Sequence, residues 1–243
     1  MKIQVYDDFQ AMSLAAANEI ADYLKANPRA LLCLPTGDSP KGVYKILAAR
    51  SDKTELFGHC TIAALDEWVG IERENPGSGT YALEYDCLSA LGIDYGRVKF
   101  FNSMSKTLEE DCAEMDRFID NAGGFDIVLL GVGRNGHVGL NEPGAAADSD
   151  CHIQLLDEIT RNVGQKYFRD NNHPPLIYGI TQGLKRMINA KKLMVLASGE
   201  VKADIMARAV DGEPVPDVPV GLLRKNPRLQ IFFDKAAASK IRS

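Results

Sequence analysis

Hydrophobic positions along the chain follow two patterns that alternate. Short, mostly apolar runs recur, and amphipathic segments with helical spacing separate them. The runs predict strands buried on both faces, and the segments between them predict helices. The predicted strands cover residues 2–6, 30–34, 60–65, 98–101, 125–133, 152–156, 176–180, 192–198 and 228–233. The predicted helices cover residues 8–26, 40–50, 79–91, 106–122, 157–170, 181–189 and 199–210.

This alternation of strands and helices predicts an α/β fold. We expect one doubly wound, mostly parallel sheet of the Rossmann-like type, with helices on both faces. No internal repeat, low-complexity tract or linker interrupts the pattern, so residues 1–243 are expected to form a single domain. Ligands of such sheets bind beyond the carboxyl ends of the strands, so we expect the functional residues in the loops that follow the strands.

The loop after the strand at 30–34 contains Thr36, Gly37, Asp38 and Ser39, and Pro40 opens the next helix. Gly37 lets the backbone approach a ligand closely. The free N–H groups of a helix N-terminus, together with the hydroxyls of Thr36 and Ser39, can cradle a monophosphate. Asp38 disfavours phosphate unless its side chain points to solvent. The alternative is a plain strand–helix turn that Ser39 caps.

Two acidic residues directly follow the strand at 60–65. One of Asp66 and Glu67 should stand at the ligand edge of the sheet. A partly desolvated carboxylate in such a place can serve as a general base. The alternative is a solvated turn residue or a helix cap.

The loop after the strand at 125–133 is the richest in polar groups. It combines four glycines within nine residues with Asn135, His137, Asn141 and Glu142. His137 titrates near neutrality and Glu142 can orient it, so the pair can relay a proton. A metal site is the rival, but the spacing offers no third ligand and fits no common zinc pattern. A structural loop with a satisfied histidine is the other alternative.

A lysine stands at the start of the helix predicted at 199–210. Lys202 lies in its first turn, after Gly199. The helix dipole disfavours a cation there unless an anion lies between the two. An exposed surface lysine is the alternative.

Composition narrows the class of ligand. The net charge of −5, from 33 acidic and 28 basic residues, argues against a nucleic-acid partner. No apolar run reaches the roughly 20 residues of a membrane span. The five cysteines include no C-x-x-C pair, which favours reduced thiols in a cytoplasmic protein. A small anionic ligand remains compatible, because its site needs only a few local donors.

The segments LPTGDSP, LDEW and GVGRNGHVGLNEPG resemble the signature segments of the glucosamine-6-phosphate deaminase/isomerase family. The likeness continues in order through GITQGLKRMINAKKLMVLASGEVKAD. Four segments are most similar in sequence to the galactosamine-6-phosphate branch of that family: LDEW, GRNGHVGLNEPG, CHIQLLD and GITQGLK. Related 6-phosphogluconolactonases share the fold and the opening of the glycine-rich loop but usually lack the Asn-Glu-Pro continuation found at residues 141–143.

The resemblance implies roles for the matched positions. Asp66 is similar to the base that moves a proton between C2 and C1 of the open-chain sugar. His137, assisted by Glu142, is similar to the group that opens the pyranose ring. Asn135 stands where many deaminases carry aspartate, so it can orient His137 without sharing its charge. The implied phosphate site contains Thr36, Gly37, Ser39 and Lys202, with Lys166 near the place of an arginine and Asp38 at a small, variable position.

The implied reaction converts galactosamine 6-phosphate, or glucosamine 6-phosphate, to tagatose or fructose 6-phosphate and ammonia, with no cofactor or metal. Two alternatives stay open. The first is a 6-phosphogluconolactonase-type lactone hydrolase that uses His137 as a base for water, and the second is a non-catalytic sugar-phosphate sensor. A homo-oligomer is compatible with the resemblance, because members of the family range from monomers to hexamers. A lid over the site is expected within residues 145–175, which follow the catalytic loop and end in a proline pair.

Overall fold

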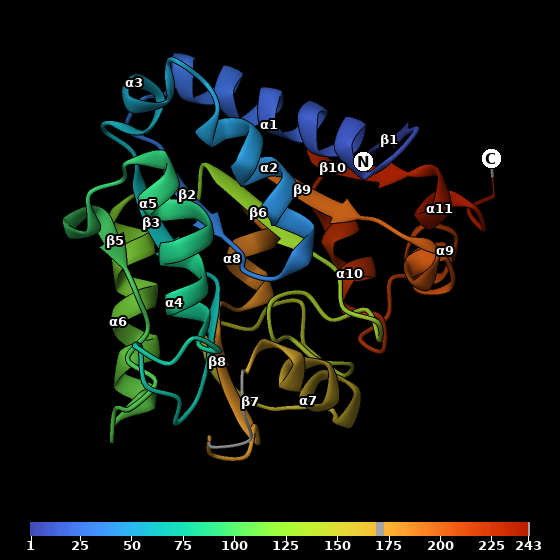
Figure 1. The fold of residues 1–243 in the computed structure, drawn as a ribbon. Helices are drawn as coiled ribbons and strands as arrows, with labels where there is room; N and C mark the ends of the chain where they lie inside the picture. Colours follow the sequence, from blue (N-terminus) through green and yellow to red (C-terminus); the bar gives the residue numbers. More distant parts are fainter. Residues whose placement is uncertain (169–172, 243) are drawn as a thin grey trace.

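The structure is a computed structural model that describes residues 1–168 and 173–242. Within these residues, seven strands form one parallel sheet (Figure 1). In spatial order they are β1 (Lys2–Tyr6), β10 (Leu229–Asp234), β9 (Lys192–Ala197), β6 (Ile127–Gly131), β2 (Leu31–Leu34), β3 (Thr61–Ala64) and β5 (Val98–Lys99). Nearly every residue of β2, β6 and β9 is buried. Since consecutive side chains of a strand point to opposite faces, both faces of the sheet are covered, and the predicted α/β fold is confirmed.

Helices fill the connections between the strands. In Figure 1, α1 and α2 lie at the top of the molecule, where α1 packs on β10 and α2 packs on β6 and β9. The α-helices are α1 (Phe9–Ala26), α2 (Asp38–Ala48), α3 (Lys53–Phe57), α4 (Gly79–Leu83), α5 (Ser89–Leu91), α6 (Leu108–Asn121), α7 (Glu158–Gly164), α8 (Leu184–Ile188), α9 (Ala203–Asp211), α10 (Pro219–Leu222) and α11 (Lys235–Ala238). Shorter turns are the π-helical η1 (Glu84–Leu88) and the 3₁₀ turns η2 (Tyr95–Arg97), η3 (Gln165–Tyr167), η4 (Glu200–Lys202) and η5 (Leu223–Lys225).

A second, antiparallel sheet stands apart from the parallel one. It consists, in spatial order, of β4 (Asp66–Trp68), β8 (Tyr178–Thr181) and β7 (His152–Leu155). The strands predicted at 152–156 and 176–180 are therefore real, but their assignment to a single sheet was wrong. The partial burial of β7 is typical of an antiparallel strand with one solvated face, unlike the continuously buried strands of the parallel sheet.

The order of the parallel strands reverses between β2 and β6. From β2 the chain builds outward through β3 to β5, and from β6 it builds in the opposite direction through β9 to β10. Open α/β sheets bind ligands at such a switch point, outside the carboxyl ends of the strands. The two loops that leave this point touch, since a Cβ on Gly131 would lie 3.3 Å from the Cβ of Ser39.

The second sheet holds the glycine-rich loop in place. The backbone N–H of Leu140 donates to Oγ1 of Thr181 at 3.1 Å. Asn141, which is fully buried, donates from Nδ2 to the carbonyl oxygens of Val138 and Gln182, each at 2.9 Å. This side chain therefore ties the loop to the end of β8.

The segment predicted as a lid, residues 145–175, is anchored near its start. Leu184 donates its N–H to Oγ of Ser149 at 3.0 Å, and Arg186 pairs with Asp150. Residues 169–172 of the segment lie outside the described residues. Between these two parts, α7 and η3 line the cleft described below, and the lid stays a prediction.

Replacing Asn141 with alanine should destabilise the protein by about 2–4 kcal/mol, because two buried hydrogen bonds are lost and the smaller side chain leaves a cavity. Denaturant unfolding measures this loss. Asn189→Ala is the matched control, since Asn189 also donates to one helix carbonyl, that of Lys185, but is exposed. We expect the control to change the free energy of unfolding by less than about 1 kcal/mol. Equal losses in the two variants would contradict the bracing role of Asn141.

Candidate active site

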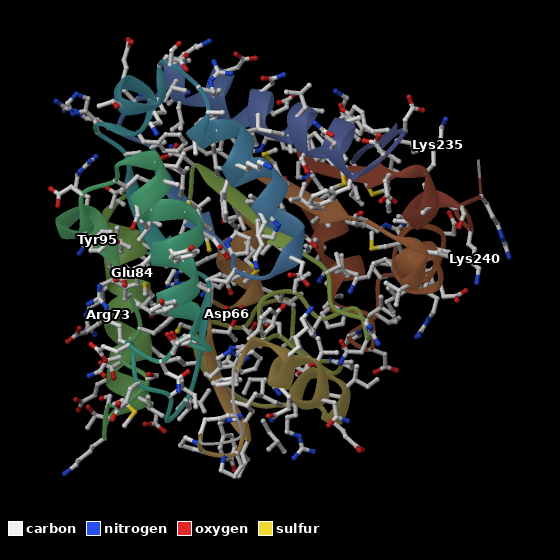
Figure 2. The ribbon with its side chains drawn as sticks, in the orientation of Figure 1. Asp66, Arg73, Glu84, Tyr95, Lys235 and Lys240 are labelled. Carbon is white, nitrogen blue, oxygen red and sulfur yellow. The ribbon has the colours of Figure 1, made fainter. Side chains whose placement is uncertain are left out.

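A cavity of about 790 Å³ opens at the switch point between β2 and β6. Eight of the ten predicted site residues line it: Thr36, Gly37, Asp38, Ser39, Asp66, His137, Lys166 and Lys202. The other two, Asn135 and Glu142, lie behind His137. Asp66, labelled in Figure 2, lies near the middle of the molecule and also borders a neighbouring cavity of about 400 Å³. The structure thus brings the predicted side chains of four loops to one place.

The turn between β2 and α2 forms one wall. Gly37 has φ +91°, a conformation that side chains other than glycine rarely adopt. It is the N-cap of α2, which begins at Asp38, two residues before the predicted start. Ser39 therefore lies inside the first turn, and the alternative in which Ser39 caps the helix is wrong. The first N–H groups of α2, which have no acceptor within the helix, stand at the cavity with the Ser39 hydroxyl.

Cations gather around this turn. Lys202 and Arg134 line the cavity together with Lys166. Burial lowers the pKa of Lys202, the charges of Arg134 and Lys166 add to the effect, and together they bring the pKa to about 8. Lys166 donates to Oδ2 of Asp38 at 2.6 Å, and this bond lowers the pKa of the Asp38 carboxyl. Positive charges close enough to lower the pKa of Lys202 repel one another, and an anionic ligand bound among them would relieve this repulsion.

Asp66 and Glu67 have opposite environments although they are neighbours in β4. Glu67 is 2% exposed and its carboxylate accepts the backbone N–H groups of Trp68, Gly79 and Thr80 at 2.6–2.8 Å. Glu67 therefore caps the start of α4. Asp66 faces the cavity, and burial, with the charge of Glu67, raises its pKa to about 7. Such a carboxyl is poised to exchange protons near neutral pH.

The structure places Glu142 beside His137, as the pair predicted from the sequence requires. Nδ1 of His137 lies 3.5 Å from Oε2 of Glu142 and 3.0 Å from Oγ1 of Thr160. Asn135 bridges the group, since its Nδ2 donates to Glu142 at 2.8 Å and its Oδ1 accepts the backbone N–H of His137 at 3.2 Å. Burial raises the pKa of Glu142, but the hydrogen bonds and charge of His137, with bonds from Thr160 and Asn135, outweigh burial and hold the pKa below its usual value. His137 is thus paired with an ionised carboxylate.

Sequence reasoning missed several residues of the cleft. Thr160 and Tyr167 approach it from α7 and η3. No local pattern marks these two, because the groups they face lie in other elements. Lys41 borders the neighbouring cavity and lies 3.8 Å from Asp38, three residues earlier on α2, so helical spacing could have marked it. Arg134 could have been found, since it is the one basic residue of a glycine-rich loop that follows a buried strand.

The described residues form neither a metal site nor a membrane-crossing helix. Among residues 1–168 and 173–242, no three His, Cys, Asp or Glu side chains are grouped to hold a metal ion. In the same part of the chain, no helix combines the length and the apolar character needed to cross a membrane.

Comparison with known sequences gives matches along nearly the whole chain. The sequence model of the family described as "Glucosamine-6-phosphate isomerases/6-phosphogluconolactonase" matches residues 7–231. A glucosamine-6-phosphate deaminase of Clostridium botulinum (strain Langeland) is 35% identical over 243 residues, which covers 100% of this chain and 99% of the relative. A glucosamine-6-phosphate deaminase of Thermoanaerobacter pseudethanolicus is 33% identical and covers 99% of this chain and 95% of its own length.

Solved structures agree with these sequence matches. A structure described as a monomeric glucosamine-6-phosphate deaminase superposes with a TM-score of 0.93 at 30% identity, over 99% of this chain and 100% of that chain. The 6-phosphogluconolactonase of Trypanosoma brucei superposes with a TM-score of 0.77 at 18% identity, over 99% and 98% of the two chains, and so shares the fold. The family resemblance stated from the motifs is confirmed. The chain belongs to the glucosamine-6-phosphate isomerase/6-phosphogluconolactonase family.

Proposed function

We propose that this protein is an enzyme that deaminates and isomerises an amino-sugar 6-phosphate, with galactosamine 6-phosphate as its preferred substrate. The observation that carries the proposal is the shared cleft of Asp66, the His137–Glu142 pair and the cationic turn at α2. The names of the relatives support an amino-sugar phosphate as the substrate. The amino-acid sequence of the motifs supports galactosamine as its sugar. The products are a ketose 6-phosphate and ammonia.

The phosphate is bound at the start of α2. Ser39, Lys202 and Lys166 supply a hydroxyl and two positive charges beside the free N–H groups of the helix. Arg134, whose charge lowers the pKa of Lys202, adds a third charge at the cavity. Binding energy gained at the phosphate, away from the reacting carbons, holds C1 and C2 beside the catalytic groups.

Ring opening is assigned to His137. Its Nδ1 is engaged by Thr160 and Glu142, so Nε2 is the nitrogen left to meet the substrate. Nε2 takes the proton of the C1 hydroxyl and delivers it to the ring oxygen. The bond between C1 and the ring oxygen breaks as the C1 carbonyl forms. Glu142 stabilises the imidazolium that exists between the two transfers.

Proton transfer between the carbons is assigned to Asp66. The carbonyl at C1 acidifies the C2–H bond, and the Asp66 carboxylate removes that proton while a proton from solvent adds to the carbonyl oxygen. The neutral enolamine receives the first proton back from Asp66 at C1, which leaves an iminium ion at C2. Water then adds to the iminium ion, and nitrogen departs as ammonium as the ketone forms. Asp66 thus carries one proton over one face of the substrate.

A coupled assay for ammonia tests the proposal. We expect turnover of galactosamine 6-phosphate, with weaker or no turnover of glucosamine 6-phosphate. The same preparation is tested for hydrolysis of 6-phosphogluconolactone, which the lactonase alternative requires. Release of ammonia from neither sugar would overturn the proposed function, and tight binding without turnover would favour the sensor. The homo-oligomer stays a prediction, while one relative is described as a monomer.

The variant Asp66→Asn removes the base and keeps the shape of the side chain. We expect kcat to fall by at least about a hundredfold, as the loss of a general base should cause. The melting temperature should not fall, because the variant removes a carboxylate whose ionisation burial disfavours. Asp22→Asn, at an exposed position on α1 outside the cleft, is the control and should keep native turnover. Turnover of Asp66→Asn near the native value would remove Asp66 from the mechanism.

The pH dependence of kcat/KM follows from the two shifted groups. Asp66 acts when ionised, so activity should rise with pH through about 7. Lys202 acts when protonated, so activity should fall as pH rises through about 8. Lys202→Arg keeps the charge at high pH and should remove the part of the alkaline fall that Lys202 causes, while the amino group of the substrate titrates as before. An alkaline limb identical in the native protein and this variant would contradict the assignment.

A further inference from the structure

Helix α7 contacts the His137–Glu142 pair at two points. Thr160 in the middle of α7 is 3% exposed, and its Oγ1 lies 3.0 Å from Nδ1 of His137. Asp157, the N-cap of α7, donates its backbone N–H to Oε1 of Glu142 at 3.2 Å. The proposed mechanism uses the first contact only to identify Nε2 as the nitrogen that meets the substrate, and it gives no role to the Thr160 hydroxyl or to the Asp157 N–H.

The protons at this cluster can be counted. Glu142 is held ionised, so its oxygens only accept, and the amide of Asn135 and the N–H of Asp157 already donate to them. A threonine hydroxyl has one proton and two lone pairs. Nδ1 of His137 faces two groups, Oγ1 of Thr160 at 3.0 Å and Oε2 of Glu142 at 3.5 Å. A carboxylate has no proton to give, so a lone pair on Nδ1 would be repelled by Glu142 whereas a hydrogen on Nδ1 is attracted. The bond between Nδ1 and Oγ1 is therefore formed with the hydrogen on Nδ1 and a lone pair of Oγ1 as its acceptor.

We propose that Thr160 is a positioning residue that holds neutral His137 in the tautomer with hydrogen on Nδ1. Nδ1 then donates to Oγ1 of Thr160, and Nε2 stands without a hydrogen at the cavity. This inference rests on the proposed function. Only the tautomer with a free Nε2 lone pair accepts the C1 hydroxyl proton, whereas the other tautomer would present an N–H to that hydroxyl.

The same segment joins this contact to the phosphate end of the cleft. From Thr160, α7 continues to its end at Gly164, and η3 follows with Lys166 and Tyr167, both of which line the cavity. One short helical segment therefore contacts the ring-opening histidine at one end and the proposed phosphate site at the other. The tautomer of His137 thus depends on the placement of an element that the bound substrate also contacts.

Nitrogen-15 NMR of protein labelled at histidine measures the tautomer directly. The chain has four histidines, and a His137→Gln variant assigns the signal. At a pH where His137 is neutral, we expect hydrogen on Nδ1 in the native protein and in Thr160→Ser. Thr160→Val keeps the shape but removes the acceptor, and the nearest remaining one, Glu142, is 3.5 Å away, so we expect a measurable Nε2–H population. Hydrogen on Nε2 in the native protein would overturn the proposal, even if no variant folds.

Kinetics supply the second test. We expect Thr160→Val to lower kcat about tenfold to a hundredfold with KM changed less than about threefold, and Thr160→Ser to stay within about threefold of native. The isotope effect on kcat with C2-deuterated substrate should fall toward one in Thr160→Val, because ring opening then limits turnover. Native kcat in a folded Thr160→Val protein would overturn the proposal. The NMR measurement uses no substrate, so it stands even if the native protein releases no ammonia and the proposed function fails.

Discussion

The pairing of β2 with β6 is the contact on which the candidate site depends. These strands are far apart in the sequence but lie side by side and parallel, so both end at the same edge of the sheet. The strand order reverses between them, and helices that would otherwise cover the edge diverge. The turn before α2 and the glycine-rich loop therefore open onto one cavity. Gly131 allows the close approach, because a side chain there would meet Ser39.

Different electrostatic environments give carboxyl groups of the same chemical type different pKa values. Asp66 is desolvated beside another acid, and its pKa rises to about 7. Glu142 is also buried, but it is surrounded by hydrogen-bond donors, and its pKa falls. A pair of groups whose environments move their pKa values apart is suited to distinct tasks, one exchanging a proton and one remaining charged. Glu67 has a third task, which is to cap α4.

Local signals were enough to find most of the site. Thr36 to Ser39, Asp66 and His137 each follow an apolar strand within a few residues, so the rule on strand ends reaches them from the sequence. The rule does not find Thr160, because this residue lies within a helix and its relevant contact is with a histidine 23 residues away. The second sheet could not be predicted either, because its strands pair at long range: β4 is three residues long and pairs with β8, more than a hundred residues later. Pairing at that range leaves no periodicity to read.

The ion pair between Asp38 and Lys166 has a consequence for selectivity among anions. Any anion that binds Lys166 competes with a carboxylate already bonded to it at 2.6 Å. An isolated inorganic ion gains only the contacts at the turn, whereas a phosphate carried by a sugar adds contacts along the rest of the cleft. The Asp38 carboxylate therefore lowers the affinity of Lys166 for every anion by the same factor. In the proposed function, a free phosphate would then bind weakly, whereas a sugar phosphate would recover the loss through its other contacts in the cleft.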